Sequence, residues 1–132
     1  MRTIEEQDAV NAVSGTVIGA AIEVHRIMGP GLMESVYEEC LILELALRGI
    51  AAERQVHTPL KYKGYDLQTT FRADLVVQNS LLVEVKSVDK LAPIHDSQVL
   101  TYLKLTGISV GLLLNFNETL LKNGIKRTVN GF

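Results

Sequence analysis

The spacing of the apolar residues changes near residue 50, and this change constrains the fold more than any other feature of the sequence. Before it, apolar residues recur at steps of three and four, which indicates amphipathic helices. After it, they alternate at a period of two, which is typical of half-buried β-strands, until a further helical segment follows Pro93. The length of 132 residues suits one core and is too short for two. We therefore expect one domain over residues 1–132.

Two helices are predicted before the change. The first ends at Gly29-Pro30-Gly31, because proline disfavours helical geometry in the residue before it. Its apolar stripe comprises Val10, Val13, Val17, Ala21, Val24 and Met28. The second helix runs from about residue 32 to residue 48, and Gly49 follows it in the position of a C-cap. We expect the apolar side of this helix to hold Leu32, Val36, Leu43 and Leu47.

Strands follow, interrupted by one more helix. They are expected over residues 52–57, 60–62, 65–70, 71–77, 81–88, 110–114 and 125–129. Lys63-Gly64 forms the turn of a hairpin, and the three residues 78–80 form a second turn. The helix covers residues 94–106 and is closed by Gly107, while the continuous apolar run at 110–114 suits a strand buried on both faces. This order predicts an α/β (α+β) fold with a mixed β-sheet flanked by helices.

Charged residues stand on two neighbouring strands in an unusual pattern. A three-residue turn at 78–80 would place Asp74 opposite Glu84 and Arg72 opposite Lys86, and like-charged pairs across a ladder are destabilising. One interpretation is a solvated outer face, stabilised by the diagonal contacts of Asp74 with Lys86 and of Glu84 with Arg72. The other is a divalent cation between Asp74 and Glu84, since Mg²⁺ is bound through one or two carboxylates plus water and phosphate. Lys86 would then orient the attacking water or stabilise a phosphate oxygen.

An aspartate, a turn and then Glu-x-Lys on the next strand resemble the signature of the PD-(D/E)XK nuclease superfamily. Here the signature reads Ala73-Asp74 and Glu84-Val85-Lys86, with alanine where the superfamily pattern has proline. Upstream, residues 31–37 read G-x-x-E-x-x-Y, from Gly31 through Glu34 to Tyr37. Together with residues 18–26 this segment resembles the GxxExxY protein family, which is grouped with those nucleases. The resemblance extends from about residue 15 to residue 129.

The resemblance implies a restriction-endonuclease-like core and a nuclease that uses Mg²⁺ or Mn²⁺. The residues carried over as catalytic are Glu34, Asp74, Glu84 and Lys86, and the three carboxylates among them would bind the metal. Gln98 and Tyr102 lie four residues apart on the third helix and resemble a Gln-x-x-x-Tyr element of RecB-like members, which shapes the site or holds DNA. Tyr37, one turn after Glu34, would pack beneath the site.

Several of these residues also have purely structural interpretations. A glutamate such as Glu34 is favoured in the first turn of a helix by the helix dipole. Gln98 and Tyr102 share a helix face with Ile94, Thr101 and Leu105, and that face is apolar enough to belong to the core. A buried tyrosine whose hydroxyl has one partner is commoner than a substrate-binding one.

The leading hypothesis is a metal-dependent nuclease acting on DNA rather than RNA. The alternative is a catalytically inactive nuclease-fold module that binds nucleic acid or a partner protein. The net charge of −2 argues mildly against a protein that coats DNA, because tight nonspecific binders carry a strong basic excess. The sequence contains neither an apolar run of about 18 residues nor a signal-peptide core, and its single cysteine, Cys40, excludes an intrachain disulfide. We therefore expect a cytoplasmic protein without membrane contact; a homodimer stays open.

Overall fold

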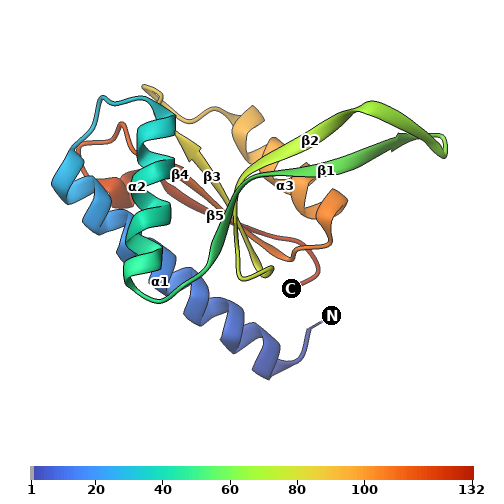
Figure 1. Cartoon of the computed structure of the whole chain (residues 1–132), viewed down its shortest axis with the longest axis horizontal. Coiled ribbons are helices and arrows are strands. Elements are labelled where there is room, and N and C mark those ends of the chain that lie inside the picture. Colours follow the sequence, from blue (N-terminus) through green and yellow to red (C-terminus); the bar gives the residue numbers. More distant parts are fainter. Residues whose placement is uncertain (1) are drawn as a thin grey trace.

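The computed structural model describes residues 2–132, and its elements follow the predicted order (Figure 1). They are α1 (Ile4–Met28), α2 (Glu34–Leu47), β1 (Ala52–Tyr62), β2 (Tyr65–Val77), β3 (Leu81–Lys86), α3 (Pro93–Thr106), β4 (Val110–Asn115), a 3₁₀ helix (Leu121–Gly124) and β5 (Ile125–Val129). The strands form one sheet in the order β1-β2-β3-β4-β5. Only β3 and β4 run parallel, and the other neighbours are antiparallel. This mixed sheet with three helices confirms the predicted fold class.

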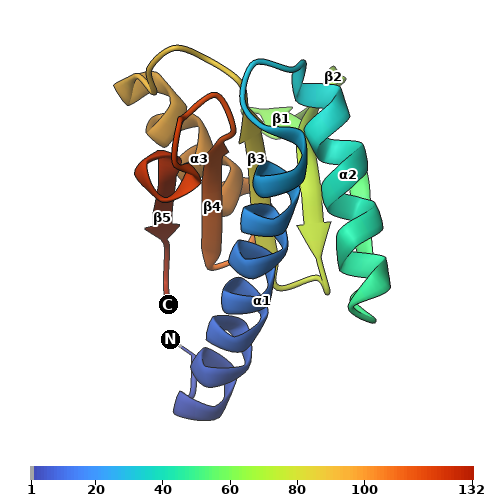
Figure 2. The ribbon, with the colours of Figure 1, turned by 90° about the vertical axis from the view of Figure 1, so that its left-hand side faces the viewer.

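Helices cover both faces of the sheet (Figure 2). Leu75 and other alternate strand residues pack with α1 and α2, whereas Leu82 packs with α3 on the opposite face. β4 lies between these two layers and is buried along its whole length, as its continuous apolar run predicts. Gly111 allows α3 to lie close to β4, because a Cβ there would stand 2.7 Å from a Val99 methyl. Within residues 2–132, no helix is long and apolar enough to cross a membrane.

The buried side of α2 differs from the prediction. Tyr37, Leu41 and Leu45 are fully buried, whereas Leu43 and Leu47 are 61% and 75% exposed. The expectation that Leu32, Val36, Leu43 and Leu47 form the buried side is therefore wrong. Leucines stand on more than one side of this helix, so their spacing alone does not show which side meets the sheet. The side of α2 that is buried is the one that carries Tyr37, Leu41 and Leu45.

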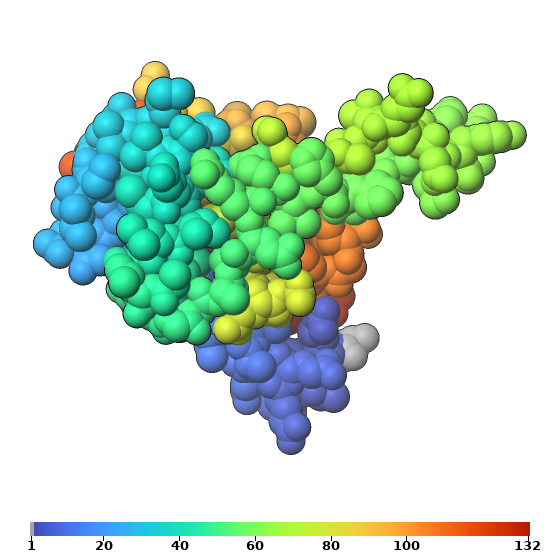
Figure 3. All heavy atoms as spheres, in the orientation of Figure 1, coloured from blue at the N-terminus to red at the C-terminus, as the bar shows by residue number. Residues whose placement is uncertain are grey.

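Beyond the sheet, β1 and β2 continue as a long two-stranded arm, here called the β1–β2 arm and defined as residues 56–73 (Figures 1 and 3). Tyr62 pairs with Tyr65 across the turn that sequence analysis predicts. Lys63 and Gly64 both have positive φ, at 50° and 83°, which is the conformation of a type I′ hairpin turn. The separate short strands expected on each side of this turn are parts of two continuous strands of 11 and 13 residues.

Candidate functional site

The pairing of β2 with β3 ends next to the two predicted metal-binding carboxylates. The ladder between them contains Val77–Leu81, as expected from the turn, and ends at Leu75–Val83. Beyond that pair, Oδ2 of Asp74 accepts a hydrogen bond from the Val85 backbone N–H at 2.9 Å. The side chain of Asp74 thus takes the place of a further ladder bond. Asp74 and Glu84 are close neighbours without being a ladder pair, so the expected direct cross-strand pairing of these charges is wrong.

Glu84 is a buried carboxyl with an unusual pKa. Burial raises the pKa of Glu84 to about 9, and the adjacent Asp74 carboxyl adds to the rise, while the charge of Lys86 opposes it. Glu84 is only 5% exposed, and no described residue donates a hydrogen bond to its Oε1. A carboxylate in such a place requires a proton or a compensating cation. The oxygen-rich Asp74–Glu84 pair therefore fits a hard divalent cation.

The raised pKa predicts that Glu84→Gln stabilises the metal-free protein at neutral pH. A group whose pKa is about 9 when folded and 4.5 when unfolded destabilises the fold progressively as the pH rises from 4.5 towards 9. At pH 7 the amide should raise the free energy of unfolding by up to about 3 kcal/mol, and the gain should shrink near pH 4.5. Urea unfolding in EDTA at both pH values measures this, with exposed Glu39→Gln as control. Equal stability of Glu84→Gln and wild type at pH 7 would contradict the prediction.

Tyr102 of α3 lies beside the two carboxyl groups. Its pKa is raised to about 12, first by burial and then by the charges of Glu84 and Asp74, whereas the charge of Arg72 lowers it. The Tyr102 ring also meets the ring of Phe71, at the base of the β1–β2 arm, edge to face. The hydroxyl therefore stays protonated at neutral pH and can donate a hydrogen bond close to the carboxylates.

The α3 face that carries Gln98 is not part of the core. Gln98 is exposed, and so are Ile94, Thr101 and Leu105, so the expectation of an apolar core on this face is wrong. Val99 and Leu103 are the buried residues of α3. The close approach of α3 to β4 turns the Val99 side inward, and Gln98 is consequently open to solvent one turn before Tyr102.

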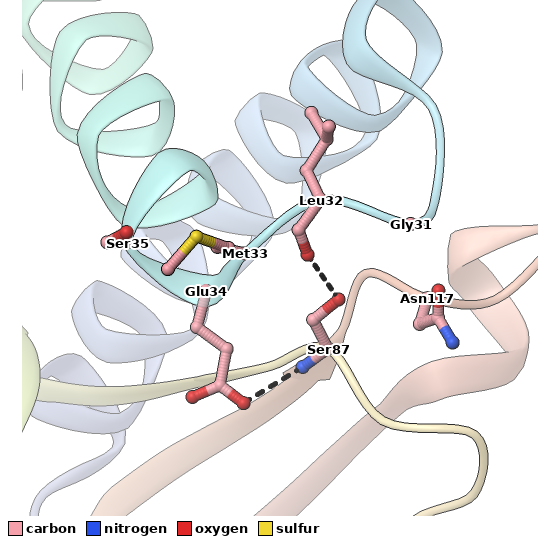
Figure 4. A pocket seen from close by; sticks show the side chains of 7 residues that line it. All are labelled: Gly31, Leu32, Met33, Glu34, Ser35, Ser87 and Asn117. Atoms are coloured by element: carbon pink, nitrogen blue, oxygen red, sulfur yellow. Dashed lines mark hydrogen bonds between the residues drawn. The ribbon is translucent and has the colours of Figure 1, made fainter.

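Glu34 connects the start of α2 with the end of β3. Its Oε2 accepts a hydrogen bond from the Ser87 N–H at 3.2 Å, and the Ser87 hydroxyl donates to the Leu32 carbonyl at 2.6 Å (Figure 4). These residues border a shallow pocket lined by Gly31, Leu32, Met33, Glu34, Ser35, Ser87 and Asn117. No group of three or more His, Cys, Asp or Glu side chains in residues 2–132 is arranged to hold a metal. Glu34 therefore reaches the backbone next to Lys86 rather than joining Asp74 and Glu84 in one cluster.

Tyr37 holds the turn that precedes Glu34. The ring is fully buried and stacks on Phe116 with 4.5 Å between ring centroids. Its hydroxyl donates to the Gly29 carbonyl and accepts a hydrogen bond from the Leu32 N–H. The Gly-x-x-Glu-x-x-Tyr segment is thus a folded unit, in which the tyrosine fixes the backbone on which the glutamate stands.

Asn115 is a buried polar residue beside the candidate site that the sequence analysis did not single out. It is fully buried at the end of β4, in register with Lys86. Its side chain accepts a hydrogen bond from the Val88 N–H at 3.1 Å and donates to the Val88 carbonyl at 2.9 Å. The backbone that leaves β3 just after Lys86 is therefore clamped. The sequence did contain a signal for this residue, since Asn115 is a single polar residue at the end of an apolar strand. A buried amide must form hydrogen bonds with other groups.

Comparisons with known proteins agree with this fold. The family model described as the PD-(D/E)XK nuclease superfamily matches residues 11–128. The crystal structure of a protein designated SSO0001 superposes with a TM-score of 0.50 and 24% sequence identity. The superposition covers 70% of this chain and 46% of that protein, so the chain spans less than half of its length and the likeness concerns the fold alone. Among curated proteins no match was found.

Proposed function

This chain belongs to the PD-(D/E)XK nuclease superfamily, and we propose that it is a divalent-metal-dependent nuclease that hydrolyses phosphodiester bonds, in DNA rather than RNA. The observation that carries the proposal is the buried Glu84 carboxyl beside Asp74, with an oxygen to which no described residue donates. In a metal-dependent nuclease, such a pair would hold Mg²⁺ or Mn²⁺ next to a phosphate. Membership of the GxxExxY family, a cytoplasmic location and a homodimer stay predictions.

The roles of the residues follow from their positions. Asp74 and Glu84 would hold the cation, which supplies Lewis-acid activation of water and neutralises charge at the phosphate. Lys86, partly buried two residues after Glu84, would orient the attacking water or stabilise a phosphate oxygen. Glu34 would keep the backbone next to Lys86 in place through Ser87.

The exposed side of α3 would contact the substrate. The Tyr102 hydroxyl, whose pKa is raised to about 12, would donate a hydrogen bond to a phosphate oxygen. Gln98 is exposed one turn away on the same helix, where its amide would contact the next phosphate or sugar. Tyr37 has no such access, because it is fully buried and both of its hydroxyl contacts are to backbone.

A calorimetric Mn²⁺ titration of wild type, Asp74→Asn and Asp8→Asn tests the metal site. We expect wild type and the exposed control Asp8→Asn to bind Mn²⁺, and Asp74→Asn to lose measurable binding. Because the pKa of Glu84 is about 9 without metal, binding at pH 7 should release about one proton. The observed enthalpy should therefore change with the ionisation enthalpy of the buffer.

The titration is repeated with a short, uncleavable duplex, because the site could bind the metal only when a substrate phosphate supplies one of the ligands. The proposal fails if wild type binds no Mn²⁺ in either titration. In that case the inactive nuclease-fold module becomes the better description of the protein. Equal Mn²⁺ binding by wild type and Asp74→Asn would show that the metal is held elsewhere on the chain.

A further inference from the structure

The β1–β2 arm extends from the body without cover from any helix along its outer half (Figure 3). Every residue from 61 to 70 is exposed. A two-stranded hairpin is only marginally stable by itself in water, and the contact of Phe71 with Tyr102 anchors this one at its base. The outer half buries nothing, so its side chains are free to contact another molecule.

Two tyrosines form the tip of the arm. Tyr62 and Tyr65 are directly paired across the turn, so their side chains leave the same face of the hairpin, and they are 63% and 75% exposed. The Lys63 ammonium lies 5.5 Å from the centroid of the Tyr62 ring. The tip therefore presents two aromatic rings with a cation beside them, in a chain with only four tyrosines and no tryptophan.

The arm also has a positive net charge, although the net charge of the whole chain is negative. Residues 56–73 contain three basic side chains, Lys61, Lys63 and Arg72, against a single acidic one, Asp66. Their net charge is +2, whereas the whole chain has −2. Lys61 is paired with Asp66 at 2.7 Å, which leaves Lys63 and Arg72 as the cations without a salt bridge among the described residues of the arm. Such a surface attracts the phosphates of a nucleic acid.

The base of the arm leads directly to the two carboxylates. Arg72 precedes Asp74 by two residues on β2, and its charge acts on Tyr102 beside the site. Tyr65 precedes Asp74 by nine positions, which corresponds to roughly 30 Å of extended strand. A nucleic-acid strand that lies along the arm would therefore contact cations and aromatic rings several nucleotides away from the cleaved phosphate.

We propose that the β1–β2 arm binds single-stranded nucleic acid, with bases stacked on Tyr62 and Tyr65 and phosphates near Lys63 and Arg72. The inference rests on the proposed function of the site at the base of the arm. A single strand fits better than a duplex because only unpaired bases offer free faces for stacking on aromatic side chains. A second copy of the chain fits less well, since two such arms would bring like charges together and the outer half is mostly polar.

Fluorescence anisotropy with a labelled 20-nucleotide single strand in EDTA tests this surface without cleavage. The double variant Tyr62→Ala/Tyr65→Ala should weaken binding at least about 10-fold, because stacking contributes strongly for each base. Tyr62→Phe/Tyr65→Phe should retain the affinity, since stacking needs the rings and not the hydroxyls. Leu47→Ala, an equally exposed apolar residue on α2, should change nothing. The tip side chains are exposed, so circular dichroism and thermal unfolding should be unchanged in all variants.

Salt and strand length sharpen the test. Lys63→Ala should reduce the slope of log affinity against log salt by about 0.7, whereas exposed Lys122→Ala, outside the arm, should not. A four-nucleotide strand is too short to contact the tip and the base of the arm together, so it should bind wild type more weakly than the 20-nucleotide strand does.

The outcomes separate the arm from the nuclease. Tyrosine-dependent binding without any cleavage in Mg²⁺ would support the arm and contradict the nuclease. Cleavage of long strands at wild-type rates by Tyr62→Ala/Tyr65→Ala, with unchanged affinity, would overturn the arm and leave the nuclease intact. A tyrosine-dependent dimer in sedimentation, without loss of nucleic-acid affinity, would also overturn the proposal and identify a second copy as the occupant.

Discussion

Asp74→Ala and Glu84→Ala are each expected to abolish phosphodiester cleavage. Removing either carboxylate takes away one of the two side chains that would hold the cation beside the phosphate. Charge stabilisation by a bound metal is worth several kcal/mol, so single-turnover rates should fall by about 10³-fold or more. Cleavage of labelled single-stranded and duplex oligonucleotides in Mg²⁺ or Mn²⁺ measures the loss.

Matched variants separate a catalytic effect from a change of charge. Asp8→Ala and Glu39→Ala each remove one exposed carboxylate from α1 or α2 and should cleave at the wild-type rate. Glu84→Ala also leaves a cavity in a buried place, so Glu84→Gln is the better folded companion and should be equally inactive. Cleavage that persists in Asp74→Ala and Glu84→Gln would refute the assignment of the site.

Lys86→Met is expected to abolish turnover while leaving Mn²⁺ binding largely intact. Methionine keeps most of the length and apolar stem of lysine but removes the ammonium group, which would orient water or stabilise a phosphate oxygen. The ligands Asp74 and Glu84 are untouched, so the Mn²⁺ affinity should change by less than about 10-fold. Calorimetry and single-turnover cleavage on the same preparation measure the two effects separately.

The control for this variant is Lys90→Met, which removes an exposed ammonium four residues further along the chain. It should change neither metal binding nor turnover. An inactive nuclease-fold module would tolerate Lys86→Met without any change in its interactions. A joint loss of Mn²⁺ binding and turnover in Lys86→Met would instead mean that the lysine supports the site structurally.

The order of the elements and the proximity of Asp74 to Glu84 were predictable from local patterns. Period-two alternation places Asp74 and Val76 on one side of β2, and Glu84 and Lys86 on one side of β3, whatever the rest of the fold does. The turn at 78–80 then brings these two sides together, as the Val77–Leu81 pair shows. The apolar run of β4 likewise signals burial on both faces, which the structure confirms.

Two of the wrong predictions concern which side of a helix is buried. α2 has leucines on more than one side, and α3 exposes Ile94 and Leu105 while burying Val99 and Leu103. Helical spacing shows that a helix has an apolar stripe. Which stripe is buried depends on close contacts with the sheet, such as that of Gly111 with Val99. The exposure of Gln98, one turn before Tyr102, depends on which stripe is buried.

Contacts between segments that are distant in the chain could not be predicted from the sequence patterns either. The bonds of Ser87 with Glu34 and of Asn115 with Val88 join residues 53 and 27 positions apart in the chain. Local preference and alternation act over a few residues, and they determined the strands, the turns and the pairing of Asp74 with Glu84 as neighbours. Burial and long-range hydrogen bonds arise only when distant segments pack, and packing alone decided the raised pKa of Glu84, the clamped backbone after Lys86 and the free-standing β1–β2 arm.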